Sequence, residues 1–235
     1  MLKIDKDTKN VIVCYDPFIF RWGGFGDGWR FCSCLLELSE KNPKKAIVAD
    51  CTTRTKEFLN LMKPLFDTTG DFQYDLPEKH NSATHYRMNW QMFFEHRQLR
   101  TKKYWEEVKT KKICYQFDGF CEANSKNPSE EDIKYFVDMS RKHGYNPINI
   151  GGYMPIGDII DTMMSSKLFI GCPSGMATMS LSTGIPMHIV TNKLTKHRSD
   201  EIRDTWYEGR RNIKFHNNLH DFIESITTNE PIKLL

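Results

Sequence analysis

Two short glycine-containing segments, each next to an apolar run, constrain the fold of this chain more than any other feature. The first covers residues 22–29 and follows the apolar run at residues 11–13; the second covers residues 169–176. Each pattern is typical of a buried strand that ends in a turn of small residues and continues into a helix. N–H groups at such a helix start lack partners and lie at the positive end of the helix dipole, which suits a phosphate. Because one segment lies in each half, the sequence predicts two similar lobes with a cleft between them.

Composition sets the frame for this prediction. A length of 235 residues permits one large domain or two small ones. Apolar residues make up 39% and charged residues 27%, which is typical of a soluble globular protein, and no apolar run approaches the roughly 18 residues of a membrane span. The start of the chain is too polar for a secretory signal. Seven cysteines without metal-site spacing predict reduced thiols in a cytoplasmic protein, and a net charge of +3 neither indicates nor excludes nucleic acid.

Apolar runs and helical patterns alternate through the first half of the chain. The pattern predicts buried strands followed by helices, with one polar loop and one long helical stretch. The expected strands are 11–15 and 46–49. One helix is expected after Gly28 toward residue 42, and two more at residues 55–62 and 89–108. Residues 67–84 are expected to be mostly loop. Alternation of this kind predicts a parallel sheet covered by helices.

The second half restarts the same alternation after a linker expected near residues 109–112. Ser129 is a favourable N-cap, whereas Gly144 and Gly184 suit the ends of helices. The expected strands are 113–117, 147–150, 168–170 and 187–190, and the expected helices are 129–143, 156–164, 175–183 and 217–226. The sequence therefore predicts a second parallel sheet.

The two glycine-containing segments carry a resemblance to a known family. Residues 23–27, Gly-Gly-Phe-Gly-Asp, resemble the turn that opens ADP-heptose:lipopolysaccharide heptosyltransferases. Residues 168–175, continued to Gly184-Ile185-Pro186, resemble that family's second signature. The resemblance implies an α/β GT-B glycosyltransferase, with two Rossmann-like lobes of parallel sheet facing one another across an interlobe cleft. Residues 1–110 would form the acceptor-side lobe and residues 111–235 the lobe that binds the nucleotide sugar.

Two departures from the family pattern concern the donor. Pro173 stands where the family usually has aspartate before the serine-glycine pair, and Thr178 stands where it usually has histidine. The nucleotide, UDP or ADP, and the sugar therefore stay open. The resemblance implies no cofactor besides this donor and no metal, and the acceptor cannot be inherited from the family.

Asp27 is the predicted catalytic residue. Inverting sugar transfer needs a base that removes the proton of the acceptor hydroxyl as this hydroxyl attacks the anomeric carbon, and the resemblance implies that role for Asp27. The alternative is an acidic residue that merely stabilises the first turn of a helix. Gly23, Gly24 and Gly26 permit positive φ and close approach of a substrate, although an ordinary tight turn also explains them.

The predicted donor site lies at the strand ends of the second lobe. Ser174 and Gly175 would offer a hydroxyl and backbone N–H groups to the donor diphosphate; the alternative is an N-cap serine without a ligand. Tyr153 would stack on the base or ribose, or be simply packed, and the basic residues after the last strand would neutralise the leaving group, or form a solvated loop. The predicted donor-binding residues are Gly151, Gly152, Tyr153, Ser174, Gly175, Met176, Lys193 and Arg198.

The predicted acceptor side surrounds the first glycine turn. Its residues are Trp22, Gly23, Gly24, Phe25, Gly26, Trp29 and Arg30. Aromatic residues, among them Tyr104 and Trp105, also interleave with the basic stretch at residues 95–112. Such a face suits a hydroxymethylated DNA base that is flipped out of the helix, or the aromatics belong to the core of an amphipathic helix. A glycan or lipid-linked sugar is the other acceptor that stays open.

Two other functions compete with glycosyl transfer. A dinucleotide-dependent oxidoreductase would explain the first glycine turn together with Asp50 at the end of the second strand. The spacing argues against it, because the third glycine of that motif would fall on Trp29. The second alternative is a non-catalytic protein that binds a nucleotide sugar without turnover.

Overall fold

The chain forms two compact units in the computed structural model, residues 1–102 and residues 103–235. The sequence placed the boundary after residue 110, but residues 103–110 belong to the second unit. The structure describes residues 4, 10–15, 24–51, 53–74, 84–88, 98–119, 127–151, 154–191 and 212–227.

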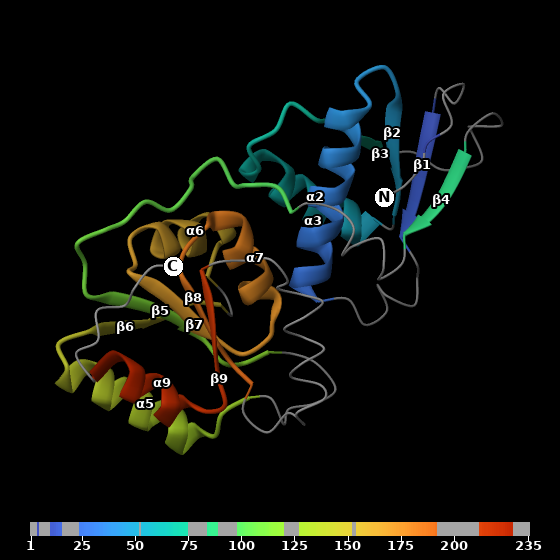
Figure 1. The fold of residues 1–235 in the computed structure, drawn as a ribbon. Coiled ribbons are helices and arrows are strands. Elements are labelled where there is room, and N and C mark those ends of the chain that lie inside the picture. The colour runs from blue at the N-terminus through green and yellow to red at the C-terminus, as the bar shows by residue number, and fades with distance from the viewer. Residues whose placement is uncertain are drawn as a thin grey trace. The chain divides into compact units, whose positions relative to one another are not determined.

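The first unit is built on a parallel sheet of four strands in the order β3-β2-β1-β4 (Figure 1). Strands β2 and β3 follow one another on one side of β1, whereas β4 pairs on its other side. The strand order therefore reverses between β1 and β4. The elements are β1 (Asn10–Tyr15), α2 (Phe25–Lys41), β2 (Ala46–Asp50), α3 (Thr53–Met62), the 3₁₀ turn η1 (Lys63–Leu65), β3 (Gln73–Tyr74) and β4 (Thr84–Met88). The sequence predicted β1 and β2 but neither β3 nor β4.

Helix α2 is the centre of the first unit. It begins at Phe25, four residues before the predicted start, and Trp29 on its inner face is completely buried. The Trp29 ring lies 4.5 Å from that of Phe66, measured between centroids. A Cβ on Gly28 would lie 2.4 Å from the Phe58 ring, so Gly28 is what allows α2 and α3 to pack closely.

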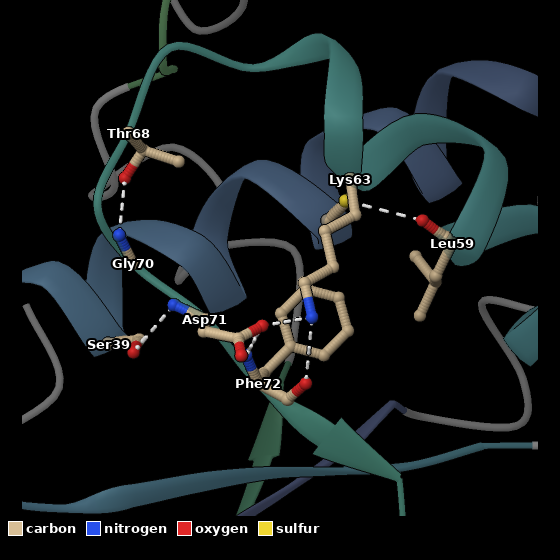
Figure 2. A network of polar contacts seen from close by, with 8 residues as sticks. Ser39, Leu59, Lys63, Thr68, Gly70, Asp71 and Phe72 are labelled. Carbon is tan, nitrogen blue, oxygen red and sulfur yellow. Dashed lines mark hydrogen bonds and ion pairs between the residues drawn. The ribbon is translucent and has the colours of Figure 1, made fainter.

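The loop after η1 is tied down by Lys63 (Figure 2). The Lys63 ammonium donates to the Phe72 carbonyl at 3.1 Å, pairs with the Asp71 carboxylate and lies 4.8 Å from the centre of the Phe72 ring. The hydrogen bond from Lys63 is the main reason why the pKa of Asp71 is lowered. The Asp71 N–H also donates to Ser39 Oγ at 2.9 Å, which fixes the loop on α2.

Gly70 makes the closest approach of this loop to α2. A Cβ at this position would lie 2.0 Å from the Leu36 carbonyl oxygen, a backbone atom that cannot move without displacing the helix. We therefore expect Gly70→Ala to lower the free energy of unfolding by about 2–4 kcal/mol. Gly157→Ala is the control, because no atom lies within 4 Å of its Cβ and alanine favours the helix there by up to about 1 kcal/mol. Urea unfolding of both variants tests this, and an equal effect of the two would contradict it.

The second unit is built on a parallel sheet of five strands in the order β6-β5-β7-β8-β9. Helices α5 and α9 cover one face of this sheet and α6 and α7 the other (Figure 1). The elements are β5 (Lys112–Gln116), α5 (Glu130–Lys142), β6 (Asn146–Asn149), α6 (Ile156–Met164), β7 (Leu168–Gly171), α7 (Gly175–Thr183), β8 (Met187–Val190), β9 (Ile213–His216) and α9 (Leu219–Thr227). The predicted α/β fold with two parallel sheets is confirmed, although β9 was not predicted.

Capping residues and glycines in the sequence correctly predicted where several helices of the second unit begin or end. Ser129 caps α5 by accepting the Asp132 N–H at 3.1 Å, as predicted. Gly144 and Gly184 end their helices with φ of +77° and +76°, a region that glycine tolerates without strain. Pro147 lies in β6 at the edge of the sheet, where its missing N–H is harmless.

Residues 98–108 are not helical, so the predicted helix 89–108 is wrong over this part, and residues 89–97 lie outside the described residues. Aromatic side chains hold the segment against the second unit instead. Trp105 donates its indole N–H to the Ser166 carbonyl and its backbone N–H to the Thr183 carbonyl, both at 2.8 Å. The Tyr104 ring covers Gly184, whose Cβ would lie 2.2 Å from it.

Two histidines pair beneath α9 in the core of the second unit. Nδ1 of His188 lies 2.8 Å from Nε2 of His216, and both rings pack edge-on against Phe222. Burial, helped by His216 and Lys214, lowers the pKa of His188 to about 3. Burial also lowers the pKa of His216 to about 4, with Lys214 acting in the same direction and Asp221 against it. Both histidines are therefore neutral in the fold at neutral pH.

This pair predicts loss of stability on acidification. As pH falls below about 6.5, histidines in the unfolded chain bind protons that the folded pair does not accept. Stability is thus fully present above that pH and is lost as the pH falls toward the folded pKa values. Between pH 7 and 5 we expect a loss of about 2–4 kcal/mol from the pair. A His188→Asn, His216→Gln variant keeps polar groups in place and should show a smaller loss in urea unfolding; an unchanged pH dependence would contradict this.

Candidate functional site

The carboxyl ends of β5 and β7 form the most informative polar cluster among the described residues. The strand order of the second sheet reverses between these two strands, because β6 pairs on one side of β5 and β7 on the other. In open α/β sheets, ligands bind outside the carboxyl ends of strands at such a reversal. The segment after β7 contains the predicted Ser174 and Gly175, and the segment after β5 contains Asp118.

A chain of hydrogen bonds joins the two strand ends. Ser174 Oγ donates to Gln116 Oε1 at 2.7 Å, and Gln116 Nε2 donates to Asp118 Oδ1 at 2.7 Å. Gln116 and Ser174 are buried, whereas Asp118 is exposed. Because an ionised carboxylate only accepts hydrogen bonds, Asp118 fixes which way the Gln116 amide points. The Ser174 proton is therefore directed toward Gln116.

Ser174 is also the N-cap of α7. Its hydroxyl accepts the Ala177 N–H at 3.4 Å, and its carbonyl accepts the Thr178 N–H at 3.0 Å. None of the described residues accepts a hydrogen bond from the N–H of Gly175 or Met176, the first two residues of the helix. The first turn of α7 carries no acidic residue. Two backbone donors and the positive end of the helix dipole are thus left for an anion.

Asn127 braces this edge of the sheet. Its side chain accepts the Gly119 N–H at 3.2 Å and donates to the Gly119 carbonyl at 3.3 Å. The Cys172 thiol lies 3.4 Å from the Asn127 amide oxygen, and the Cys172 N–H donates to the Gln116 carbonyl at 3.3 Å. The segment after β5 and the turn after β7 are therefore held together by side-chain and backbone bonds.

The remaining predicted donor residues fall into two groups. Gly151 follows β6 with φ of +129°, and its Cβ would lie 3.3 Å from Gln116 Cγ, so the backbone at Gly151 requires glycine. It lies beside the Gln116 chain of hydrogen bonds. The predicted residues Gly152, Tyr153, Lys193 and Arg198 lie outside the described residues.

Asp27 lies in the first turn of α2. Its Oδ2 accepts the Gly24 N–H at 3.0 Å, and its own N–H donates to the Gly24 carbonyl at 3.1 Å. Gly24 is extended with φ of −81° and Gly26 is helical, so neither residue uses the positive φ that glycine permits. Among the described residues, no atom lies within 4 Å of where a Gly24 Cβ would be. This part of the chain therefore leaves room at Gly24 for close approach of a ligand.

Other residues of the predicted acceptor side belong to the core. The Trp29 ring is completely buried and cannot face an acceptor, which corrects the prediction for this residue. The Phe25 ring stacks on Trp29 at 6.0 Å and meets Phe58 edge-on at 5.5 Å, because the helix begins early enough to include it. Arg30 is half-buried on α2. Trp22 and Gly23 lie outside the described residues.

The cysteines described in the structure carry free thiols. Cys32, Cys34, Cys114 and Cys172 are buried and Cys51 is partly exposed. Burial raises the pKa of the Cys114 thiol to about 12 and that of Cys51 to about 11, so these thiols are protonated at neutral pH. Within the described ranges, no three His, Cys, Asp or Glu side chains gather as a potential metal site. Nor does any helix there have the length and apolar character to cross a membrane.

Gln116, Asp118 and Asn127 were missed by sequence reasoning. The available signal was the position of Gln116 and Asp118 at the end of a predicted strand, since strand ends of parallel sheets meet at one edge. Nothing local in the sequence indicates that Gln116 pairs with Ser174, which lies 58 residues away.

Two structures of TibC are among the solved structures that resemble this chain. The first is the bacterial iron-containing dodecameric glycosyltransferase TibC from enterotoxigenic E. coli H10407, with a TM-score of 0.53 and 14% identity over 78% of this chain. What the two proteins share is the fold. The second is the dodecameric iron-containing heptosyltransferase TibC in complex with ADP-D-β-D-heptose, with a TM-score of 0.52 and 13% identity over 80% of this chain.

The similarity to TibC covers only part of the TibC chain. This chain spans 58% and 59% of the two TibC chains, so part of TibC has no counterpart in it. No protein-family model matches the chain, and no curated protein matches its sequence. The predicted likeness to heptosyltransferases is thus confirmed for the fold.

Proposed function

We propose that this protein is a glycosyltransferase that moves a sugar from a nucleotide-diphosphate-sugar to an acceptor hydroxyl, with inversion and without a metal. The observation that carries the proposal is the start of α7 at the reversal of strand order, with the N–H groups of Gly175 and Met176 available to an anion. The fold shared with TibC, which was solved with ADP-D-β-D-heptose, supports the same class of donor.

The chemistry assigned to α7 is stabilisation of the leaving diphosphate. Negative charge grows on the diphosphate as its bond to the sugar breaks, and backbone donors already fixed in place meet that charge without rearrangement. Ser174 contributes by capping the helix, because its proton is committed to Gln116. This assignment refines the sequence prediction, in which the Ser174 hydroxyl itself contacted the diphosphate.

Asp27 is the proposed base for the acceptor hydroxyl. Its carboxylate is held at the start of α2 by the Gly24 N–H, beside a glycine with open space in front of it. The carboxylate would take the hydroxyl proton while the hydroxyl oxygen bonds to the anomeric carbon and the diphosphate leaves with the electrons of the broken bond.

Of the two acceptors that the sequence left open, we propose the glycan. A hydroxymethylated DNA base would need exposed aromatic rings on which to stack. Trp29 is buried in the core, and Trp105 uses its indole N–H to fix the segment after residue 102 on the second unit. The Tyr104 ring is 41% exposed but packs over Gly184. Among the described residues, these three aromatics therefore support a structural use, and an assay with both acceptor classes tests the choice of acceptor.

Gly175→Pro tests the diphosphate site. Proline removes one N–H at the first helical position, where its ring is tolerated, and Ser174 before it is extended with φ of −151° and ψ of 176°. We expect affinity for UDP or ADP, measured by calorimetry, to fall about 10-fold or more, since a hydrogen bond to a charged group is lost. Gly175→Ala keeps the N–H and should bind within about 3-fold of the native chain. Equal binding by both variants would remove α7 from the donor site.

Asp27→Asn tests the base. Asparagine keeps an oxygen that accepts the Gly24 N–H, so the helix start is preserved while the basic group is lost. We expect turnover, followed as nucleoside diphosphate release with glycan acceptors, to fall by about 10²–10⁴ with donor binding unchanged. Asp27→Ala should in addition lose about 1 kcal/mol of stability, because the hydrogen bond from the Gly24 N–H to the carboxylate is lost. Native turnover in Asp27→Asn would leave the carboxylate only a structural role, and donor binding without any turnover in the native chain would indicate a non-catalytic binding protein.

A further inference from the structure

We propose that Asp118 recognises hydroxyl groups of the donor, and that Gln116 positions it for this task. The inference rests on the proposed function and concerns the same site at the ends of β5 and β7. Nothing in the sequence or in the comparison with TibC assigns a role to either residue. The ligand chemistry is a neutral sugar hydroxyl, or a pair of neighbouring hydroxyls, on a nucleotide sugar.

Asp118 is held in place by Gln116. Gln116 Nε2 donates to Oδ1 of Asp118 at 2.7 Å, and no other described residue donates to this exposed carboxylate. An ionised carboxylate accepts about four hydrogen bonds, so most of its capacity is open toward solvent. A carboxylate fixed on one side and open on the other is a preorganised acceptor.

The hydrogen bonds of Gln116 have a fixed direction. Because Gln116 gives its N–H to Asp118, it presents its oxygen to Ser174, whose single proton points inward. Among the described residues at this edge, the donors left for an anion are the N–H groups of Gly175 and Met176, and the open acceptor is Asp118. Phosphate binds donors and is repelled by a carboxylate, whereas a hydroxyl can donate to one. The site is therefore divided into a part for phosphate and a part for hydroxyls.

Further hydrogen bonds make this edge of the sheet rigid. Asn127 holds Gly119, the residue after Asp118, through two hydrogen bonds of 3.2 and 3.3 Å. It also contacts the Cys172 thiol at 3.4 Å in the turn that leads to α7. The hydroxyl acceptor and the helix start are thus fixed to one another through Asn127 and through Gln116, as recognition of two parts of one molecule requires.

Asp118→Asn is the decisive variant, because asparagine still accepts the Gln116 N–H but carries no charge. Calorimetry is run with ADP, UDP, an ADP-sugar, a UDP-sugar, 2′,3′-dideoxy-ADP and inorganic pyrophosphate. We expect the affinity for the preferred ribonucleotide ligand to fall about 10-fold, since a charged acceptor is replaced by a neutral one, and pyrophosphate to bind equally well or better. Asp138→Asn, which removes an exposed charge on α5, is the control and should change neither affinity.

The ligands separate the two sources of hydroxyls. If ribose supplies them, ADP loses affinity in Asp118→Asn, and its advantage over 2′,3′-dideoxy-ADP disappears. If the transferred sugar supplies them, only the nucleotide sugar loses affinity. Unchanged or stronger binding of every ligand in Asp118→Asn would overturn the proposal, because the carboxylate would then only repel phosphate.

Gln116→Glu tests the positioning role separately. Glutamate can accept the Ser174 proton but, when ionised, cannot donate to Asp118, so the link to α7 survives and the hold on Asp118 is lost. We expect KM for the donor to rise with kcat little changed, and the discrimination between hydroxyl-bearing and deoxy ligands to weaken. A purely structural role would leave that discrimination intact. A native chain that binds no nucleoside diphosphate would refute the proposed function itself, whereas normal binding with unaffected variants would refute only this inference.

Discussion

The parallel arrangement of the strands is the constraint on which the rest of the structure depends. Every strand of a parallel sheet must be followed by a crossover, so all carboxyl ends meet at one edge and each leads into a turn or helix start there. In the second unit this brings Gln116, Asp118, Gly151 and Ser174 to the same edge, although they come from three strands. Polar chemistry gathers there because the strands themselves are buried and apolar.

Features that depend on neighbouring residues were predictable from the sequence. The apolar runs that form β1, β2, β7 and β8 are buried on both faces. A strand buried in this way is visible in the sequence as an unbroken run of apolar residues. Caps behave in the same way, because Ser129 and Gly184 act within their own turns. The start of α7 at Gly175 was likewise evident from the serine-glycine pair that precedes it.

Features that depend on distant residues were not predictable. The role of Gln116 arises from a partner 58 residues away, and that of Trp105 from a carbonyl 61 residues away. The aromatic and basic stretch looked helical because its residue types favour an amphipathic helix, but hydrogen bonds to Ser166 and Thr183 hold residue 105 outside any helix. Strands β3, β4 and β9 are short and carry polar residues, so their pairing depends on the sheet edge already being present.

The two helix starts that look alike in sequence differ in their electrostatics. At α2 the N-cap is Gly24, and Asp27 in the first turn accepts its N–H, so a negative charge already lies close to this helix end. At α7 the cap is the neutral Ser174, and the first turn contains no acidic residue. A phosphate is therefore favoured at α7 and disfavoured at α2. This difference in charge is why we propose the donor diphosphate site in the second unit and the base for proton transfer at the start of α2.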